Sequence, residues 1–182
     1  MITTGNVQVS PQHLTLGCDL TIPKHVTDDV LKRYSLLAAF MKGQTPPLPA
    51  DIEPSVRTYL ERVSARRNGE DEGKAVTPLA IMQISHSGRQ SMNLVGGRRP
   101  FELPLSPSAT RVGESALKSR DNFINKLFYK VLFQQAREMT TDEIEETIDA
   151  FVRAAKLAQL SGFDGVQIHG AHGCTSSSND LC

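Results

Sequence analysis

Apolar positions in the last third of the chain recur at a helical spacing, and the residues at either end mark where that helix starts and stops. Thr140 is the predicted N-cap, and Glu143 three residues later completes a capping box. Gly162 is the predicted left-handed C-cap. We expect the apolar residues of this helix to share one face that packs on a sheet: Ile144, Ile148, Phe151, Ala155 and Ala158.

Three short runs have the composition of β-strands. Residues 79–84 are apolar except for Gln83, which is typical of a parallel strand with both faces covered. Residues 163–169 follow the helix directly and form the next predicted strand. Residues 1–9 carry β-branched side chains interrupted by Gly5, and they predict a third strand.

The remaining segments are less regular. A helix is predicted to begin after Thr27 and to end at Gly43, and a weaker helical pattern covers residues 54–67. Residues 85–139 show no clear periodicity, and we interpret them as a functional excursion from the regular fold. The elements alternate as strand, helix, strand, helix, strand. That order predicts an α/β fold built on a parallel sheet.

The composition narrows the range of partners. Of 182 residues, 39% are hydrophobic, which suits one globular domain, while Lys plus Arg and Asp plus Glu both number 20. A net charge of zero argues against binding to nucleic acid or to an anionic membrane. Three scattered cysteines do not make a disulfide framework, and no apolar stretch approaches the roughly 20 residues of a transmembrane helix. We therefore expect a cytoplasmic protein with free thiols that binds a small molecule.

Polar side chains gather near the carboxyl ends of the predicted strands. Alternation along the last strand places Gln167 and His169 on one face, and the same alternation turns Gln83 inward at an equivalent height in the earlier strand. His172 follows His169 by three residues in a glycine-punctuated turn. Two neutral imidazoles that converge on one oxygen could bind a carbonyl or a phenolate. The apolar face of the last strand is expected to meet the helices: Val166 and Ile168.

Other interpretations of these residues remain open. A histidine at a strand end can simply cap the strand or face solvent. A zinc site is a second possibility, since four residues have suitable donors: His169, His172, Cys174 and Cys182. His86 lies in a turn with Ser85 and Arg89, and we interpret it as packing within that turn. The pair Arg98 and Arg99 is interpreted as a solvated turn.

Four segments, in the same order along the chain, resemble the old yellow enzyme class of flavin-dependent oxidoreductases, which includes the oxophytodienoate reductases. They are ITTGNVQV at Ile2 to Val9, PLAIMQISHSGRQS at Pro78 to Ser91, REMTTDEIEETIDAFVRAAKLAQLSGFDG at Arg137 to Gly165, and VQIHGAHG at Val166 to Gly173. Together they cover about a third of the chain.

The resemblance implies a TIM barrel, (β/α)8, that binds FMN at its carboxyl-terminal mouth and uses NAD(P)H to reduce the activated C=C bonds of enones and enals. It implies that Gln83 hydrogen-bonds the pyrimidine side of the flavin and that Gly5 lets the backbone approach the ring. It further implies that His169 and His172 bind the carbonyl oxygen of an α,β-unsaturated substrate. Cys174 stands where the family has a proton-donating tyrosine, so we assign no catalytic residue.

The resemblance also implies that this chain supplies only part of the family fold. A TIM barrel takes on the order of 250 residues, and the matching segments correspond to about strands 2 to 4 with their helices. We expect residues 1–173 to form a partial FMN-binding barrel, truncated at both ends, and residues 174–182 to be a tail foreign to the family. An alternative hypothesis is a catalytically inactive remnant that interacts with a full-length paralogue.

Overall fold

The computed structural model describes residues 1–15, 17, 19–44, 54, 57–58, 78–112 and 123–171. Its centre is a parallel sheet built around β4 (Ala80–Ser85). On one side β4 pairs with β7 (Gly165–Ile168), and on the other side it pairs first with β1 (Ile2–Thr3) and then with β2 (Val7–Gln8). The last strand of the sheet, β3 (Leu20–Thr21), pairs with β2. The helical connections between the parallel strands confirm the predicted α/β fold. In the described residues the sheet stays open and does not close into a barrel.

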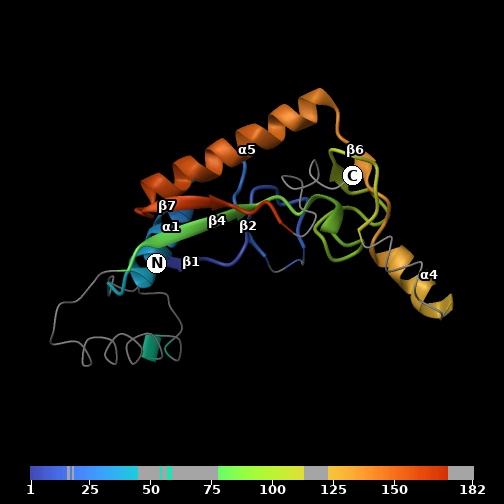
Figure 1. The fold of residues 1–182 in the computed structure, drawn as a ribbon. Coiled ribbons are helices and arrows are strands. Elements are labelled where there is room, and N and C mark those ends of the chain that lie inside the picture. The colour runs from blue at the N-terminus through green and yellow to red at the C-terminus, as the bar shows by residue number, and fades with distance from the viewer. Residues whose placement is uncertain are drawn as a thin grey trace.

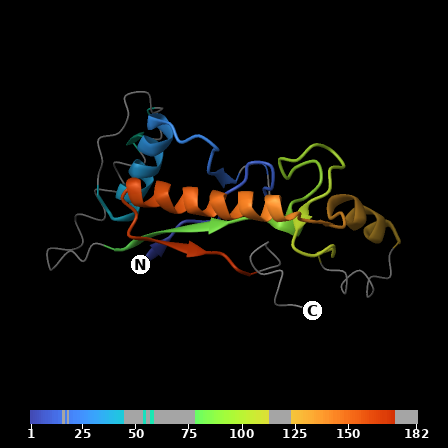
Figure 2. The same cartoon turned by 90° about the horizontal axis from the view of Figure 1, so that it is seen from above.

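Two helices cover one face of this sheet. Helix α5 (Thr141–Leu160) lies along β4 and β7, and α1 (Asp28–Met41) packs beside its carboxyl-terminal half (Figures 1 and 2). The predicted helix ends are confirmed: the Thr27 hydroxyl accepts from the amide of Val30, and Gly162 is left-handed with a φ of 81°. One core joins the helices to the sheet, with these fully buried members: Val7, Ile22, Met82, Ile84, Ala154 and Leu157.

The buried face of α5 differs from the predicted one. The capping box between Thr140 and Glu143 is present, but Ile144 and Ile148 are 41% and 56% exposed. The residues buried against the sheet are three alanines and one leucine, of which Ala158 was on the predicted face: Ala150, Ala154, Leu157 and Ala158. The predicted Phe151 packs partly against the same core. Alanines at a spacing of four let the helix axis approach the strands closely. This close approach explains why the alanine face is buried although the isoleucines are larger and more apolar.

The predicted single strand over residues 1–9 is two strands separated by a bulge. Thr3 pairs with Ile81 and Val7 pairs with Ile84, so four steps along the first strand oppose three steps along β4. The extra residue lies in the segment that contains Gly5. A bulge reverses which face the following residues occupy, and it places Val7 in the core rather than on the open face.

The excursion after β4 has more structure than its sequence predicts. It contains a short 3-10 turn, η1 (Gly88–Gln90), a helix, α4 (Phe123–Leu132), and a parallel pair of two-residue strands, β5 (Leu105–Ser106) and β6 (Arg137–Glu138). Helix α4 projects away from the sheet (Figure 1) and was not predicted.

Arg98 is a second difference in this excursion. It was interpreted as part of a solvated turn, but it is buried and donates to the hydroxyl and carbonyl oxygens of Ser91 at 3.1 and 2.7 Å. Those two acceptors compensate the cost of removing the guanidinium from water. Its neighbour Arg99 is exposed, as expected.

The predicted helix over residues 54–67 falls largely outside the described residues. Pro54, Arg57 and Thr58 are helical, and the Thr58 hydroxyl donates to the carbonyl of Pro54 at 2.9 Å.

Candidate functional site

The open face of the sheet carries an amide pair on its two longest strands. Gln83 of β4 and Gln167 of β7 are directly paired in the parallel register, and therefore point to the same side. The Nε2 of Gln83 donates to the Oε1 of Gln167 at 3.0 Å. Neither side chain is buried, so both amides face accessible space. The predicted position of Gln83 on the sheet face that points away from the helices is confirmed.

This face is uncovered because both helices lie on the other one. Along β4 the side chains that face the helices are buried, with Ala80 and Met82 at 0% exposure, while Ile81 and Gln83 stay partly exposed. The expectation of a strand covered on both faces is therefore wrong for the described part of the chain.

His169 follows β7 at the carboxyl end of the sheet. Its backbone N–H donates to the carbonyl of Ile84 at 2.9 Å, which extends the parallel ladder by one residue. Strand alternation then turns its half-buried imidazole to the same face as Gln83 and Gln167. His172 and Cys174 lie outside the described residues, so the paired-histidine hypothesis and the predicted tail stay predictions.

The apolar side chains of β7 are on the predicted side but stay partly exposed. Val166 and Ile168 are register-paired with the buried Met82 and Ile84, yet they are 40% and 61% exposed. Helix α5 contacts β7 as well as β4, and in the described residues β7 is an edge strand with no further strand beside it.

The bulge brings Thr4 and Gly5 next to Gln83. The backbone N–H of Gln83 donates to the hydroxyl of Thr4 at 2.8 Å, where a regular ladder would supply a carbonyl. Gly5 is exposed, and a Cβ built on it would meet no heavy atom within 4 Å. The backbone at Gly5 is thus open to a ligand at the edge of the amide pair.

Sequence reasoning did not assign a role to Gln167 or Thr4. Gln167 shares a face with Gln83 in the strand alternation, and that pattern was the available signal. The hydrogen bond between Thr4 and Gln83 depends on the bulge, which no pattern in the sequence predicts.

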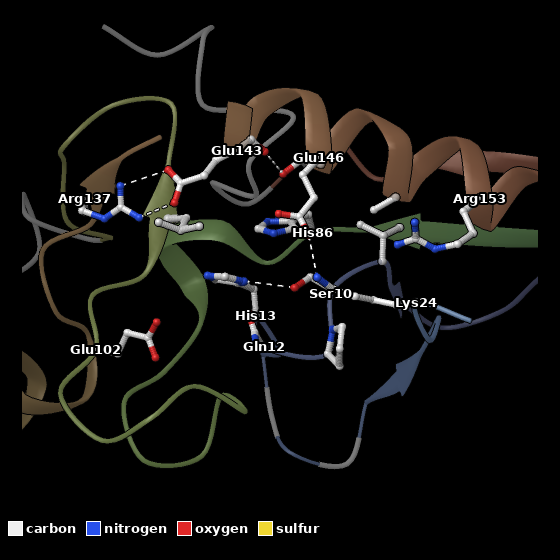
Figure 3. Close-up of a pocket in the computed structure, with 15 residues that line it drawn as sticks. Ser10, Gln12, His13, Lys24, His86, Glu102, Arg137, Glu143, Glu146 and Arg153 are labelled. Atoms are coloured by element: carbon white, nitrogen blue, oxygen red, sulfur yellow. Dashed lines mark hydrogen bonds and ion pairs between the residues drawn. The ribbon is translucent and has the colours of Figure 1, made fainter. Parts of the chain in front are cut away.

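A concavity lies on the opposite, helix-covered side of the sheet. It has a volume of about 180 Å³ and is lined by the residues after β2, the residues after β4 and the first half of α5. Figure 3 shows His13 and His86 within it, beside Arg137 and Glu143. The two imidazoles stack with their centroids 4.9 Å apart.

Both imidazoles of this concavity are held neutral. Burial, together with the charge of Arg98, lowers the pKa of His13 from 6.5 to about 4. Burial lowers the pKa of His86 to about 3, and the Nδ1 of His86 accepts from the amide of Gly88 at 3.2 Å. The interpretation of His86 as a residue that packs within its turn agrees with this burial.

The charged groups of the concavity pair with one another. Arg137 binds both carboxylate oxygens of Glu143 at 3.1 and 2.5 Å, and this pairing is the main cause of the lowered pKa of Glu143, about 2. Lys24 binds Glu146 at 2.7 Å. The ion pairs fasten the start of α5 to the strand ends, which gives this polar cluster a structural role.

The described part of the chain contains neither a metal cluster nor a membrane-spanning helix. No three His, Cys, Asp or Glu side chains there lie together in a way that could hold a metal ion. No helix in the described ranges is long and apolar enough to span a membrane.

Solved structures share this fold. The old yellow enzyme homologue from Zymomonas mobilis aligns with 94% of the chain at a TM-score of 0.53 and 21% identity, over 35% of its own length. Morphinone reductase in complex with tetrahydroNAD aligns with 94% of the chain at a TM-score of 0.56 and 18% identity, over 37% of its length. At these identities the likeness establishes the fold.

Curated relatives match the sequence more directly. The 12-oxophytodienoate reductase 1 of Oryza sativa subsp. japonica is 44% identical over 131 residues, 68% of this chain and 31% of that protein. A NADH-dependent flavin oxidoreductase of Neonectria sp. (strain DH2) is 29% identical over 95% of this chain and 18% of its own length. The chain thus spans between about a fifth and a third of the length of these relatives.

The sequence profile of the NADH:flavin oxidoreductase / NADH oxidase family matches residues 72–175, more than half of the chain. This match contains β4, α5 and β7, the elements that form the amide pair and carry His169. The chain therefore belongs to the NADH:flavin oxidoreductase / NADH oxidase family, the old yellow enzyme class that its motifs resemble.

Proposed function

We propose that this chain supplies part of the FMN site and of the substrate site of a NAD(P)H-dependent oxidoreductase that reduces the activated C=C bonds of enones and enals. When bound, FMN supplies the relay that accepts a hydride from NAD(P)H and delivers it to the β-carbon of the alkene. The observation that carries the proposal is the amide pair of Gln83 and Gln167, on the same face as His169 at the carboxyl end of a parallel sheet.

The residues on the open face fit a flavin. The pyrimidine side of an isoalloxazine presents both hydrogen-bond donors and acceptors, and an amide offers both. After Gln83 has donated one Nε2 proton to Gln167, its Oε1 and a second Nε2 proton are left for a ligand. Gly5 supports the fit because a flat ring could approach its backbone without meeting a side chain.

The substrate role rests on the two histidines. A neutral imidazole N–H at His169, with a second from His172, would bind the carbonyl oxygen of the substrate and stabilise the negative charge that develops there during hydride addition. We expect substitution of either histidine to weaken the binding of a phenolic ligand more than the retention of flavin. Equal losses of both would contradict this division of roles.

A catalytically inactive remnant that binds a full-length paralogue is the second candidate. It is favoured by the exposed apolar residues of β7, Val166 and Ile168, because large apolar side chains at an open sheet edge suit a protein partner.

A cytoplasmic location and a domain boundary between residues 173 and 174 are also part of the proposal. The low cysteine content supports the location.

One purification separates the two candidates. The 182-residue chain is purified in the presence of FMN, and its absorption spectrum is recorded before and after denaturation. Flavin released on denaturation, together with NADPH oxidation that depends on cyclohexenone, would support the oxidoreductase. A colourless chain that co-purifies in a fixed ratio with a co-expressed full-length relative would support the remnant and contradict the enzyme.

A further inference from the structure

We propose that Gln167 is a positioning residue that fixes the orientation of the Gln83 amide for the flavin. The inference rests on the proposed function and adds to it a residue that had no role in the sequence-based prediction. Its basis is the 3.0 Å hydrogen bond from the Nε2 of Gln83 to the Oε1 of Gln167.

A glutamine side chain needs such a partner to present a defined edge. Its amide can rotate by half a turn, which exchanges a donor for an acceptor at nearly the same position. An amide free to rotate would offer a flavin the correct edge for only part of the time, and the apparent affinity falls by that fraction. With its Nε2 bonded to the Oε1 of Gln167, Gln83 presents its Oε1 and its second Nε2 proton to the open face for a larger share of the time.

The geometry of the two strands keeps this partner in place. Gln83 and Gln167 are paired in the parallel register, one step from Ile84 and Ile168, so neighbouring backbone hydrogen bonds of the ladder fix their separation. At the start of β7, Gly165 leaves room for Ile81, whose Cδ1 would lie 3.2 Å from an added Cβ. The missing side chain at Gly165 therefore gives Ile81 room on the face that carries the amide pair.

The main chain of Gln83 is held at a second point. Its N–H donates to the buried hydroxyl of Thr4 at 2.8 Å. The bulge therefore leaves the backbone of Gln83 tied to its neighbour, and the remaining freedom of this residue lies in its side chain. The hydrogen bond to Gln167 restricts that freedom.

The test compares three forms of the full chain: the unsubstituted protein, Gln167→Leu and Gln167→Glu. Leucine removes the acceptor at similar volume, whereas a carboxylate can only accept and so enforces the orientation of Gln83 seen in the structure. The matched control is Gln159→Leu, the same change at an exposed position of α5. Gln167→Met takes the place of the leucine variant if that variant does not fold.

Two measurements are made on each form. The side-chain amide signals of Gln83 are followed by ¹⁵N–¹H NMR without flavin, and the dissociation constant for oxidised FMN is measured by quenching of flavin fluorescence. We expect Gln167→Leu to move the Gln83 amide signals and to weaken FMN binding by about three- to tenfold, the range for one lost hydrogen bond. Gln167→Glu should stay within about twofold of the unsubstituted chain, and the control should not change.

Unchanged Gln83 amide signals in Gln167→Leu would overturn the inference, and so would equal FMN affinity of all the forms. If the unsubstituted chain shows no saturable FMN binding, the proposed function fails, and the positioning role fails with it. The two failures are distinguishable because the NMR measurement reports the hydrogen bond without flavin.

Discussion

Acidification from pH 7 to about pH 4 should destabilise this protein through the stacked pair of His13 and His86. Their pKa values in the folded chain are about 4 and about 3, against an ordinary value of 6.5. Because both folded values are depressed, the unfolded chain binds more protons below pH 6.5. The stability that the neutral pair contributes is therefore complete above pH 6.5 and falls as the pH drops.

The size of the effect follows from these shifts. Each histidine alone would cost about 3 kcal/mol at pH 4, since one pKa unit corresponds to about 1.4 kcal/mol. The two losses add, because the unfolded chain protonates both histidines at pH 4, while the stacked rings of the folded chain oppose a second proton. We expect a combined loss of about 6 kcal/mol, a large part of the roughly 5 to 15 kcal/mol of a typical domain.

Urea denaturation followed by circular dichroism at several pH values between 7 and 4 measures this loss. His86→Asn keeps an acceptor for the Gly88 amide but cannot titrate, so it should be less stable at pH 7 and show a flatter pH dependence. His25→Asn removes an exposed histidine and should keep the full slope. The lowered pKa of Glu143, about 2, affects stability only below about pH 4.5. An unchanged slope in His86→Asn would refute the reasoning.

Three substitutions test other parts of the structure by the free energy of unfolding. Arg98→Ala should lower the free energy of unfolding by about 1 to 3 kcal/mol, because it leaves the buried acceptors of Ser91 unpaired. Arg99→Ala, at an exposed position, should be nearly neutral. Equal effects of the two substitutions would contradict the structural role of the buried Arg98. Thr4→Val should cost about 1 to 3 kcal/mol by leaving the Gln83 amide without an acceptor, and Thr4→Ser should restore most of it. Gly96→Ala should cost about 1 to 3 kcal/mol, since its Cβ would lie 2.4 Å from a backbone oxygen; a neutral result would contradict that packing.

The sequence predicted the features that depend on local chemistry. The helix start after Thr27, the N-cap at Thr140, the left-handed Gly162 and the shared face of Gln83 and Gln167 all depend on short segments of the chain. These features were sufficient to place the candidate site at the carboxyl ends of β4 and β7.

The features that the sequence did not predict depend on contacts between distant segments. The apolar pattern of α5 suggested a face with Ile144 and Ile148, but packing distance to the sheet selected the alanine face. The burial of Arg98 depends on acceptors in another turn. The bulge at Gly5 follows from the register against β4, which is set across a separation of about eighty residues.

The central claim is that the open face around Gln83 holds FMN, and a fluorescence titration of FMN with the 182-residue chain and its Gln83→Leu variant tests it most directly. We predict saturable binding of one FMN per chain, weakened about tenfold or more in the variant, since both hydrogen-bonding atoms of the amide are lost. Binding that does not saturate, or equal affinity of the two forms, would contradict the claim.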